Sequence, residues 1–184
     1  MENLPDPPDS ALLERFQGGE AAAFDLLVDR WQGPLLRFAA SLLRREEAAE
    51  DAVQEAFVRL IRKPPSTGND GCLGPWLFRV CRNLCYDAMK TDARERKRRE
   101  KARPPVEAAT PADAAEAGEL AALVGRELEK LPEREREVLR LKVHEGLSYQ
   151  QIAEITGVAA GTVGWMIHQA MGHLCDRMRA LEAL

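Results

Sequence analysis

Cysteine and histidine are the residue types in this chain best suited to metal or nucleophilic chemistry, but their spacing argues against both. Cys81 and Cys85 lie one helical turn apart with Cys72 nearby, whereas all three histidines fall late in the chain, at positions 144, 168 and 173. A structural metal site needs about four ligands in a closed geometry. We therefore interpret these cysteines as small, reduced core thiols, and we predict no metal and no other cofactor.

Catalytic groups are equally hard to assign. The sequence contains no phosphate-cradling P-loop, and no serine, histidine and aspartate stand out as a triad. The paired acids at 46–47 and 50–51 lie on one surface helix rather than in an evident pocket. We therefore predict that the protein is not an enzyme.

The strongest local charge is basic. Residues 90–103 hold eight Lys or Arg against three acids, and residues 104–119 hold four acids and no base, in a chain whose net charge is −4. A charge asymmetry of this kind can mark a segment that faces nucleic acid. The plainer alternative is a solvated helix end.

Residues 149–168, YQQIAEITGVAAGTVGWMIH, match the helix-turn-helix pattern. Ser148 is a suitable N-cap, Ile152 and Ala153 pack inside, and Gly157 supplies a turn in which positive φ is easiest for glycine. The small core is closed by Val158, Val163 and Ile167. Such a motif places its second helix in the major groove of DNA, although an ordinary αα-hairpin is the alternative.

The second helix of this motif is unusual because it lacks charge. From Gly157 to Cys175 there is no Lys, Arg, Asp or Glu, whereas DNA-reading helices usually rely on Arg and Lys. Glycines inside it cost the helix about 1 kcal/mol each. The positions expected to face the groove are Ala160, Gly161, Gly164, Trp165, His168, Gln169 and Gly172.

Three interpretations of this helix stay open. In the first, Thr162, His168, Gln169 and backbone amides contact DNA, and positive charge comes from Arg136, Arg140, Lys142 or Arg177. In the second, the DNA surface is weakened or lost, and Trp165 and Met166 contact a protein instead. In the third, Trp165 and its neighbours belong to the core of a helical bundle.

The elements that position these residues are predicted to be helices, because Ala, Leu, Glu and Arg dominate and β-branched residues are sparse. Ser10 caps a short helix that ends at Gly18-Gly19, and a second stretch from residue 20 is interrupted at Gly33-Pro34. Pro75 opens a later helix with core positions at Trp76, Leu77, Val80, Leu84 and Ala88. Residues 46–62 form the clearest amphipathic helix, with an apolar stripe of Ala49, Val53, Ala56, Phe57, Leu60 and Ile61.

Four more helices are expected near 119–130, 133–145, 148–156 and 160–181. The acidic, Pro- and Ala-rich stretch at 104–118 suits a linker. We therefore predict an all-α protein of two small helical domains, at 1–100 and 119–184, joined by a flexible linker at 101–118. The C-terminal domain contains the helix-turn-helix.

The N-terminus, MENLPDPPDS, has no secretory signal pattern, and no stretch approaches the roughly 18 apolar residues of a membrane span. We therefore expect a cytoplasmic protein with no membrane insertion.

Three ordered segments carry a family resemblance: AEDAVQEAFVRLIR at 49–62, PWLFRVCRNLCYDAMK at 75–90, and LPEREREVLRLKVHEGLSYQQIAEITGVAAGTV at 131–163. In this order they resemble the extracytoplasmic-function (ECF) group of sigma-70 family RNA polymerase sigma factors, over about residues 9–180. The family's two helical domains, regions two and four, agree with the organisation predicted above. One departure stands out: basic residues commonly follow Gly-Thr-Val in the family, but Gly164, Trp165 and Met166 follow it here.

The resemblance implies roles for particular residues. Asp51, Gln54, Glu55 and Arg59 correspond to the face that docks on the β′ coiled coil of the polymerase, although a solvated helix face is the alternative. Loop 64–73 corresponds to the segment that cradles a flipped −10 base. The residues implied to engage the −10 element are Trp76, Arg79, Arg82 and Asn83. Trp76 either stacks on an unpaired base or is buried beneath the loop.

The implied −35 reader is residues 149–168, with Thr162, Trp165, His168 and Gln169 as the candidate contacts. The implied function is promoter-specific transcription initiation together with core RNA polymerase, contacted through its β′ coiled coil and β flap. An anti-sigma factor is the further partner that the resemblance implies. Two rivals stay open: a sigma-like decoy that binds an anti-sigma factor or polymerase without reading a −35 element, and an ordinary helix-turn-helix regulator.

Overall fold

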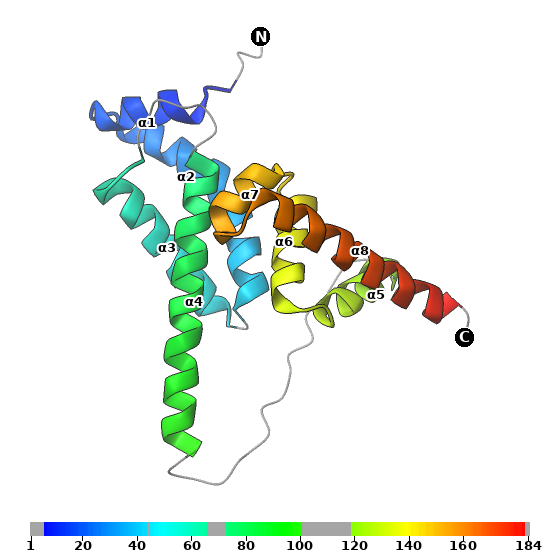
Figure 1. The fold of residues 1–184 in the computed structure, drawn as a ribbon. Coiled ribbons are helices and arrows are strands. Elements are labelled where there is room, and N and C mark those ends of the chain that lie inside the picture. Colours follow the sequence, from blue (N-terminus) through cyan, green and yellow to red (C-terminus); the bar gives the residue numbers. More distant parts are fainter. Residues whose placement is uncertain (1–5, 44, 66–72, 101–118, 183–184) are drawn as a thin grey trace. The chain divides into compact units, whose positions relative to one another are not determined.

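The computed structural model describes residues 6–43, 45–65, 73–100 and 119–182, and within these ranges every regular element is a helix (Figure 1). The helices are α1 (Asp9–Gln17), α2 (Ala21–Leu42), α3 (Glu46–Arg62), α4 (Leu73–Glu100), α5 (Glu119–Glu129), α6 (Glu133–Val143), α7 (Tyr149–Thr156) and α8 (Ala160–Glu182). The chain divides into two compact units, unit 1 at residues 1–92 and unit 2 at residues 93–184. The all-α prediction is confirmed. The linker predicted at 101–118 lies outside the described residues, and the predicted domain bounds stay predictions.

Helix α1 begins at Asp9, after Pro8, so the predicted cap at Ser10 is wrong and Ser10 lies in the first turn. The end of α1 is as predicted: Gly18 follows the last turn, and Gly19 takes φ +97°, a conformation that favours glycine. Helix α2 runs unbroken through Pro34, so the predicted interruption at Gly33-Pro34 is also wrong. Burial of Leu27, Leu35 and Phe38 along one face stabilises the helix on both sides of the proline.

Trp31 ties three helices of unit 1 together. Its Nε1 donates a hydrogen bond of 3.0 Å to Oδ2 of Asp9 at the start of α1. Arg30 forms an ion pair with the same carboxylate. A Cβ at residue 74 would overlap the Trp31 ring, so only glycine lets the first turn of α4 approach this closely. Edge-on contact with Phe78, whose ring centroid lies 6.2 Å away, completes the junction.

Helix α3 has the predicted bounds, and five of the six predicted stripe residues are buried. Ile61 is the exception, because 49% of it stays exposed, and it lines a groove described below. The core face of α4 is rotated from the predicted one. Val80, Leu84 and Ala88 are only half-buried, whereas the fully buried residues of this face are Leu77, Phe78, Cys81 and Cys85.

Cys81 and Cys85 are both fully buried, which confirms that they are small core thiols. A hydrogen bond with Cys85, together with burial, raises the pKa of the Cys81 thiol far above its usual range. Cys175 is exposed, and Cys72 lies outside the described residues.

Unit 2 holds the helix-turn-helix, and the bounds of its helices follow the prediction closely. Ser148 accepts a hydrogen bond from the amide of Gln151, whose side chain accepts one from the amide of Ser148, so α7 starts with a complete capping box. Gly157 ends α7 at φ +75°. Ile152 and Val163 are fully buried between α7 and α8, whereas Ala153 is only half-buried.

Candidate nucleic-acid and protein interfaces

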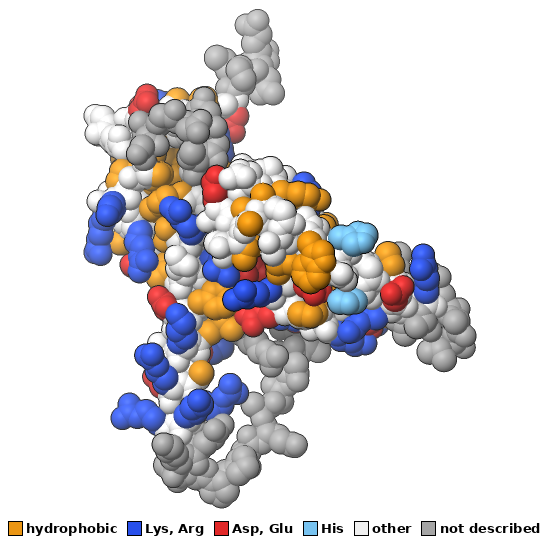
Figure 2. Space-filling model, in the orientation of Figure 1, with side chains coloured by type: hydrophobic (Ala, Val, Ile, Leu, Met, Phe, Trp, Pro, Cys, Tyr) orange, Lys and Arg blue, Asp and Glu red, His pale blue; other side chains and the backbone are white. Residues whose placement is uncertain are grey.

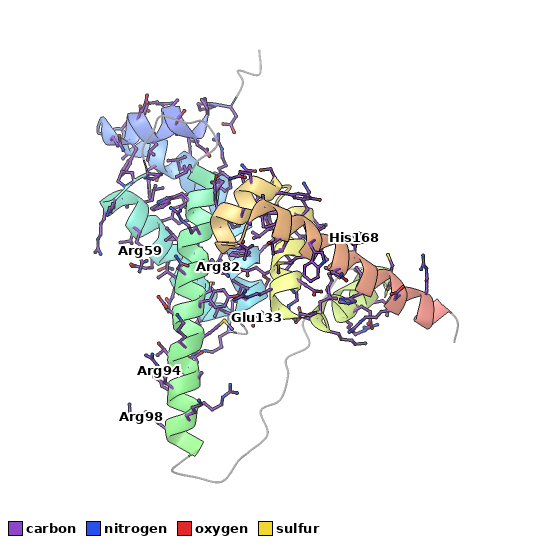
Figure 3. The ribbon with its side chains drawn as sticks, in the orientation of Figure 1. Arg59, Arg82, Arg94, Arg98, Glu133 and His168 are labelled. Carbon is purple, nitrogen blue, oxygen red and sulfur yellow. The ribbon has the colours of Figure 1, made fainter. Side chains whose placement is uncertain are left out.

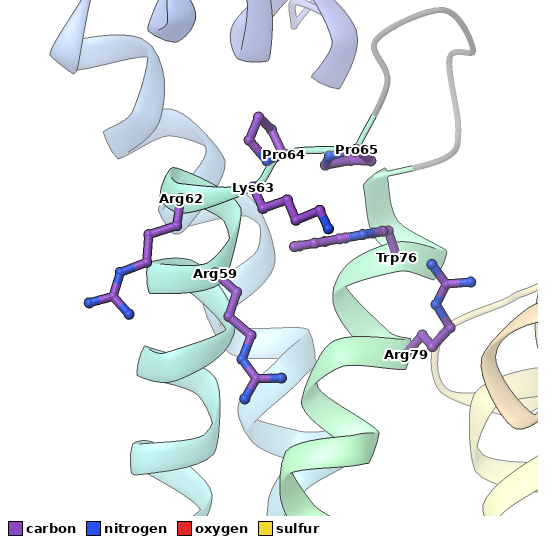
Figure 4. Close-up of a pocket in the computed structure, with 7 residues that line it drawn as sticks. All are labelled: Arg59, Arg62, Lys63, Pro64, Pro65, Trp76 and Arg79. Atoms are coloured by element: carbon purple, nitrogen blue, oxygen red, sulfur yellow. The ribbon is translucent and has the colours of Figure 1, made fainter.

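A pocket of about 610 Å³ opens between the end of α3 and the start of α4 (Figure 4). We call it the cationic pocket. Its lining combines four basic side chains with two prolines and one indole: Arg59, Arg62, Lys63, Arg79, Pro64, Pro65 and Trp76. In Figure 4 the Trp76 ring projects from α4 toward α3, flanked by the side chains of Lys63 and Arg79. This combination suits a ligand that carries both negative charge and a planar ring, as nucleotides do.

Local sequence explains how the pocket forms. Helix α3 stops at Arg62 because Pro64 follows its C-cap, Lys63, and so two basic side chains project at the helix end. The start of α4 is fixed by the close contact between Gly74 and Trp31. That contact directs Trp76, two residues later, away from the core, and its side chain stays half-exposed.

The four residues predicted to engage the −10 element are only partly brought together. Trp76 and Arg79 both line the cationic pocket. Arg82 and Asn83 lie one turn further along α4, and the Arg82 guanidinium sits 4.5 Å from the centroid of the Tyr86 ring. Of loop 64–73, the described residues beside the pocket are Pro64 and Pro65, and residues 66–72 lie outside the described ranges.

Sequence reasoning missed Arg62 and Lys63 as site residues. Both precede Pro64-Pro65, and the sequence alone indicates only that they belong to a helix end. A basic pair directly before a predicted nucleotide-binding loop was the available signal.

The four predicted docking residues of α3 do not share one surface. Gln54 and Arg59 are separated by about 140° around the helix. Gln54 lines an apolar groove, whereas Arg59 lines the cationic pocket. Asp51 is exposed, and Glu55 bridges toward the pocket through an ion pair of 3.1 Å with Arg59.

The apolar groove has a volume of about 460 Å³ and runs between α2 and α3. We call it the α2–α3 groove. Apolar side chains form its floor and polar ones its rim: Phe24, Val28, Leu36, Val53, Phe57, Val58 and Ile61, with Gln32, Glu50 and Gln54. A concave apolar surface with a polar rim is typical of a protein-binding site.

The far end of α4 carries exposed cations. Arg94, Arg96, Lys97 and Arg98 are all exposed, and in Figure 3 Arg94 and Arg98 project from this part of the helix. Figure 2 shows the Lys and Arg side chains gathered here. The side chains of the basic run beyond residue 98 lie outside the described set.

The exposure of side chains on α8 in unit 2 bears on the three interpretations of this helix given above. Trp165 is 58% exposed, so it does not belong to a bundle core, and that interpretation is wrong. Met166 is only 7% exposed because it packs inside the motif, and this burial argues against the alternative in which Met166 contacts a protein. Thr162 and His168 are exposed, and Gln169 is half-buried.

The cations expected to assist α8 are engaged within unit 2. Arg136 and Arg140 both pair with Glu129, and burial lowers the pKa of Arg140 despite that pairing. Lys142 donates to the carbonyl of Leu147 at 3.2 Å. Arg177 lies 3.7 Å from Glu127. That these side chains supply charge to DNA stays a prediction, and their contacts within unit 2 are the interactions that DNA would have to share or displace.

The described residues hold neither a metal-ligand cluster nor a helix suited to span a membrane. Among the described residues, no cluster of three or more His, Cys, Asp or Glu could hold a metal ion. No helix in the described part of the chain is long and apolar enough to cross a membrane.

Comparison with known proteins matches two separate segments of the chain. Residues 27–95 match Sigma-70 region 2, and residues 121–174 match Sigma-70, region 4. The RNA polymerase sigma-H factor of Pseudomonas aeruginosa is 30% identical, covering 91% of this chain and 92% of the relative. The ECF RNA polymerase sigma-E factor of Escherichia coli K12 is 32% identical, covering 94% of this chain and 95% of the relative.

Solved structures agree. The sigma factor RpoE in complex with the anti-sigma factor NepR from Bartonella quintana matches with a TM-score of 0.67 at 26% identity, covering 85% of this chain and 96% of that one. CnrH, in complex with the cytosolic domain of CnrY, matches with a TM-score of 0.66 at 24% identity, covering 94% of this chain and 97% of that one, a likeness of fold. These matches define an alternative sigma factor, which directs transcription initiation. The chain belongs to the ECF group of the sigma-70 family.

Proposed function

We propose that this sigma factor captures the unpaired −10 strand of its promoter in the cationic pocket. The observation that carries the proposal is the combination of Trp76, two prolines and four basic side chains around one cavity. An indole can stack on any unpaired base, and basic side chains hold the flanking phosphates. Capture of unpaired bases favours the melted state of the promoter, since a paired strand offers no free base face.

The α2–α3 groove and the neighbouring face of α3 are the proposed contact with core RNA polymerase, through its β′ coiled coil. A helix of the partner can lay its apolar side against Phe24, Val28 and Val58, and Gln54 supplies a hydrogen-bonding group at the rim. Asp51 adds an exposed negative charge to the neighbouring face of α3, and Glu55 lies toward the cationic pocket through its ion pair with Arg59.

Further partners and the location follow from the same role. The chain resembles a sigma factor solved with an anti-sigma factor, so an anti-sigma factor is a proposed partner here as well. Promoter DNA and polymerase lie in the cytoplasm, where we expect this chain to act. The polymerase carries out nucleotidyl transfer, and the chain contributes no catalytic group.

A sigma-like decoy remains the second candidate, because one observation favours it. Helix α8 presents no Lys, Arg, Asp or Glu between Gly157 and Cys175. Such a surface gains little from phosphate neutralisation. A decoy would bind an anti-sigma factor or polymerase and leave promoters unread.

Run-off transcription with purified core polymerase tests the proposal. We expect promoter-dependent transcripts from the wild-type chain once any anti-sigma factor is absent. Trp76→Ala should lower their yield by roughly tenfold, since loss of base stacking costs about 1–3 kcal/mol. Arg45→Ala, an exposed basic residue outside the pocket, is the matched control and should retain the yield. Transcription no higher than with core enzyme alone would contradict the proposal and favour the decoy.

A further inference from the structure

The outward face of α8 carries an unusual group of side chains. Gly161, Trp165, His168 and Gly172 fall within about 60° of one another around the helix. All four are exposed, on the side opposite to the buried Val163 and Ala170. We call this surface the glycine–tryptophan face. Figure 2 shows hydrophobic and histidine side chains as neighbours on unit 2.

Nothing inside the protein requires the two glycines. A Cβ at Gly161 or Gly172 would meet no atom within 4 Å, and neither residue has positive φ. Gly164 differs, since a Cβ there would lie 3.4 Å from the Tyr149 ring. Glycine inside a helix is unfavourable relative to alanine, so the fold alone would prefer alanine at 161 and 172. Because these two glycines have no side chain, a partner can come close to the helix backbone at positions 161 and 172. This close approach is the advantage that glycine offers there.

The same reasoning applies to Trp165, because the fold alone does not require a tryptophan at this exposed position. It is 58% exposed and lies between the two glycines on the same face, so the glycines leave its indole standing clear of the helix surface. A large exposed aromatic side chain is a typical contact residue of a binding surface. No Lys, Arg, Asp or Glu shares this face from Gly157 to Cys175, so its largest contact with a partner is the apolar indole of Trp165, with His168 as the neighbouring hydrogen-bonding group.

The helix-turn-helix geometry identifies the partner. The capping box at Ser148 and the turn at Gly157 set α8 as the second helix of the motif, the helix that enters the major groove. Base edges in that groove present one apolar group, the C5-methyl of thymine. Recognition of guanine by Arg or Lys is not available on this face.

We infer that Trp165 is a specificity-determining residue that packs on thymine methyl groups in the upstream promoter element, while Gly161 and Gly172 admit the groove wall close to the helix backbone. The inference rests on the proposed function, because it requires a promoter that this chain recognises. Recognition by this face gains nothing from counterion release, so its contribution to affinity is nearly independent of salt.

Deoxyuridine scanning tests the inference. Deoxyuridine differs from thymidine only by loss of the C5-methyl group. Holoenzyme made from the full chain and core polymerase is assayed on a promoter that it transcribes, with each upstream thymine replaced in turn. We expect replacement of one or two thymines to lower transcription by about fourfold each, the value of one buried methyl group. Trp165→Ala should lower transcription on the thymine promoter and abolish the difference between thymine and deoxyuridine.

Two further variants separate recognition from folding. Gly161→Ala should raise the melting temperature, because alanine favours helix, yet lower transcription from the same promoter. Met171→Ala is the matched control, since Met171 is 42% exposed on α8 but lies about 90° away from the glycine–tryptophan face. It should leave the thymine preference unchanged.

The inference is overturned if no upstream thymine matters, or if Trp165→Ala keeps the preference for thymine over deoxyuridine. It is also overturned if Trp165→Ala weakens co-purification with core polymerase or an anti-sigma factor and leaves the DNA response intact, which would identify a protein partner. Failure of the proposed function is distinguishable, because then the wild-type chain yields no promoter-dependent transcript on any template.

Discussion

The cationic pocket and the glycine–tryptophan face differ in almost every property that matters for binding DNA. The pocket places four basic side chains around Trp76, at the junction of α3 and α4. The face of α8 places Trp165 between glycines and carries no ionisable charge besides His168. In the roles proposed for them, one region depends on phosphate neutralisation and base stacking, and the other on apolar contact with base edges. The contrast predicts that substitutions of the two tryptophans respond differently to salt concentration.

Reversing charge in the pocket should have the largest effect. The double variant Lys63→Glu/Arg79→Glu is expected to lower promoter-dependent transcription by about a hundredfold or more, and to reduce the slope of log affinity against log salt by about 1.4, for two lost single-strand contacts. Both side chains are exposed, so the fold should survive. Binding to a −10 oligonucleotide at several salt concentrations measures the slope. An unchanged slope would contradict phosphate contact by these residues.

Gly74→Ala should lower the stability of the packing between α2 and α4 that supports the cationic pocket. The stability of unit 2 should stay unchanged. A Cβ at this position overlaps the Trp31 ring, which is held by Asp9. Overpacking of this kind costs about 1–3 kcal/mol of unfolding free energy. Amide exchange during urea unfolding should show the loss in α4. Gly125→Ala, in open space on α5, is the matched control and should stabilise its helix. An equal change in unfolding free energy for Gly74→Ala and Gly125→Ala would contradict the packing role of Gly74 against Trp31.

Gln54→Arg tests whether α3 contributes to two separate binding surfaces. Placing charge at the rim of the α2–α3 groove should weaken association with core polymerase by roughly tenfold, the effect of one moderate interface residue. Binding of a −10 oligonucleotide by the free chain should stay unchanged, because Gln54 does not line the cationic pocket. Polymerase co-purification and oligonucleotide titration give the two readouts. Loss of both together would mean that the surfaces are not separate.

The smallest expected effect is a pH dependence inside unit 2. A hydrogen bond from Lys130 lowers the pKa of Glu127, and Arg177 adds to it. Because the folded pKa lies below the unfolded value of about 4.3, this carboxylate stabilises the fold above that pH and loses its contribution as the pH falls through the folded pKa. Glu127→Gln should therefore lower stability at pH 7 but have little effect at pH 2. Amide exchange of α5 and α8 measures the stability of wild type and Glu127→Gln at both pH values. An equal loss of stability at pH 7 and pH 2 would contradict the role given to the Glu127 carboxylate.

Elements coded by local signals were predicted well. Acids in the first turn mark the start of α3, and Pro64 marks its end. The Ser148 cap marks the start of α7, and Gly157 marks its end. Each signal lies within one or two turns of the helix boundary that it sets. Pro34 was misjudged because burial along α2, a tertiary effect, outweighs a missing backbone donor. The core face of α4 differs from the predicted one because Phe78 packs against Trp31 and Phe38 of α2, a tertiary contact that turns Val80 and Leu84 partly outward.

The residues that line the cationic pocket are grouped only in part by the sequence, for the same reason. Trp76 and Arg79 share one segment with the family motif, so they were found together. Arg62 and Lys63 reach the same pocket from α3 across a chain separation of more than ten residues, which no periodic pattern encodes. The exposure of Trp165 and burial of Met166 depend on how α8 packs against α6 and α7, and only the structure separates these neighbours.

The most direct test is the affinity of holoenzyme for an oligonucleotide that carries the unpaired −10 strand, compared between wild type and Trp76→Ala/Arg79→Ala. Binding in the cationic pocket predicts that the variant loses most of its affinity for this strand while it still associates with core polymerase. A variant that binds the single strand as tightly as wild type would contradict capture of the promoter in this pocket.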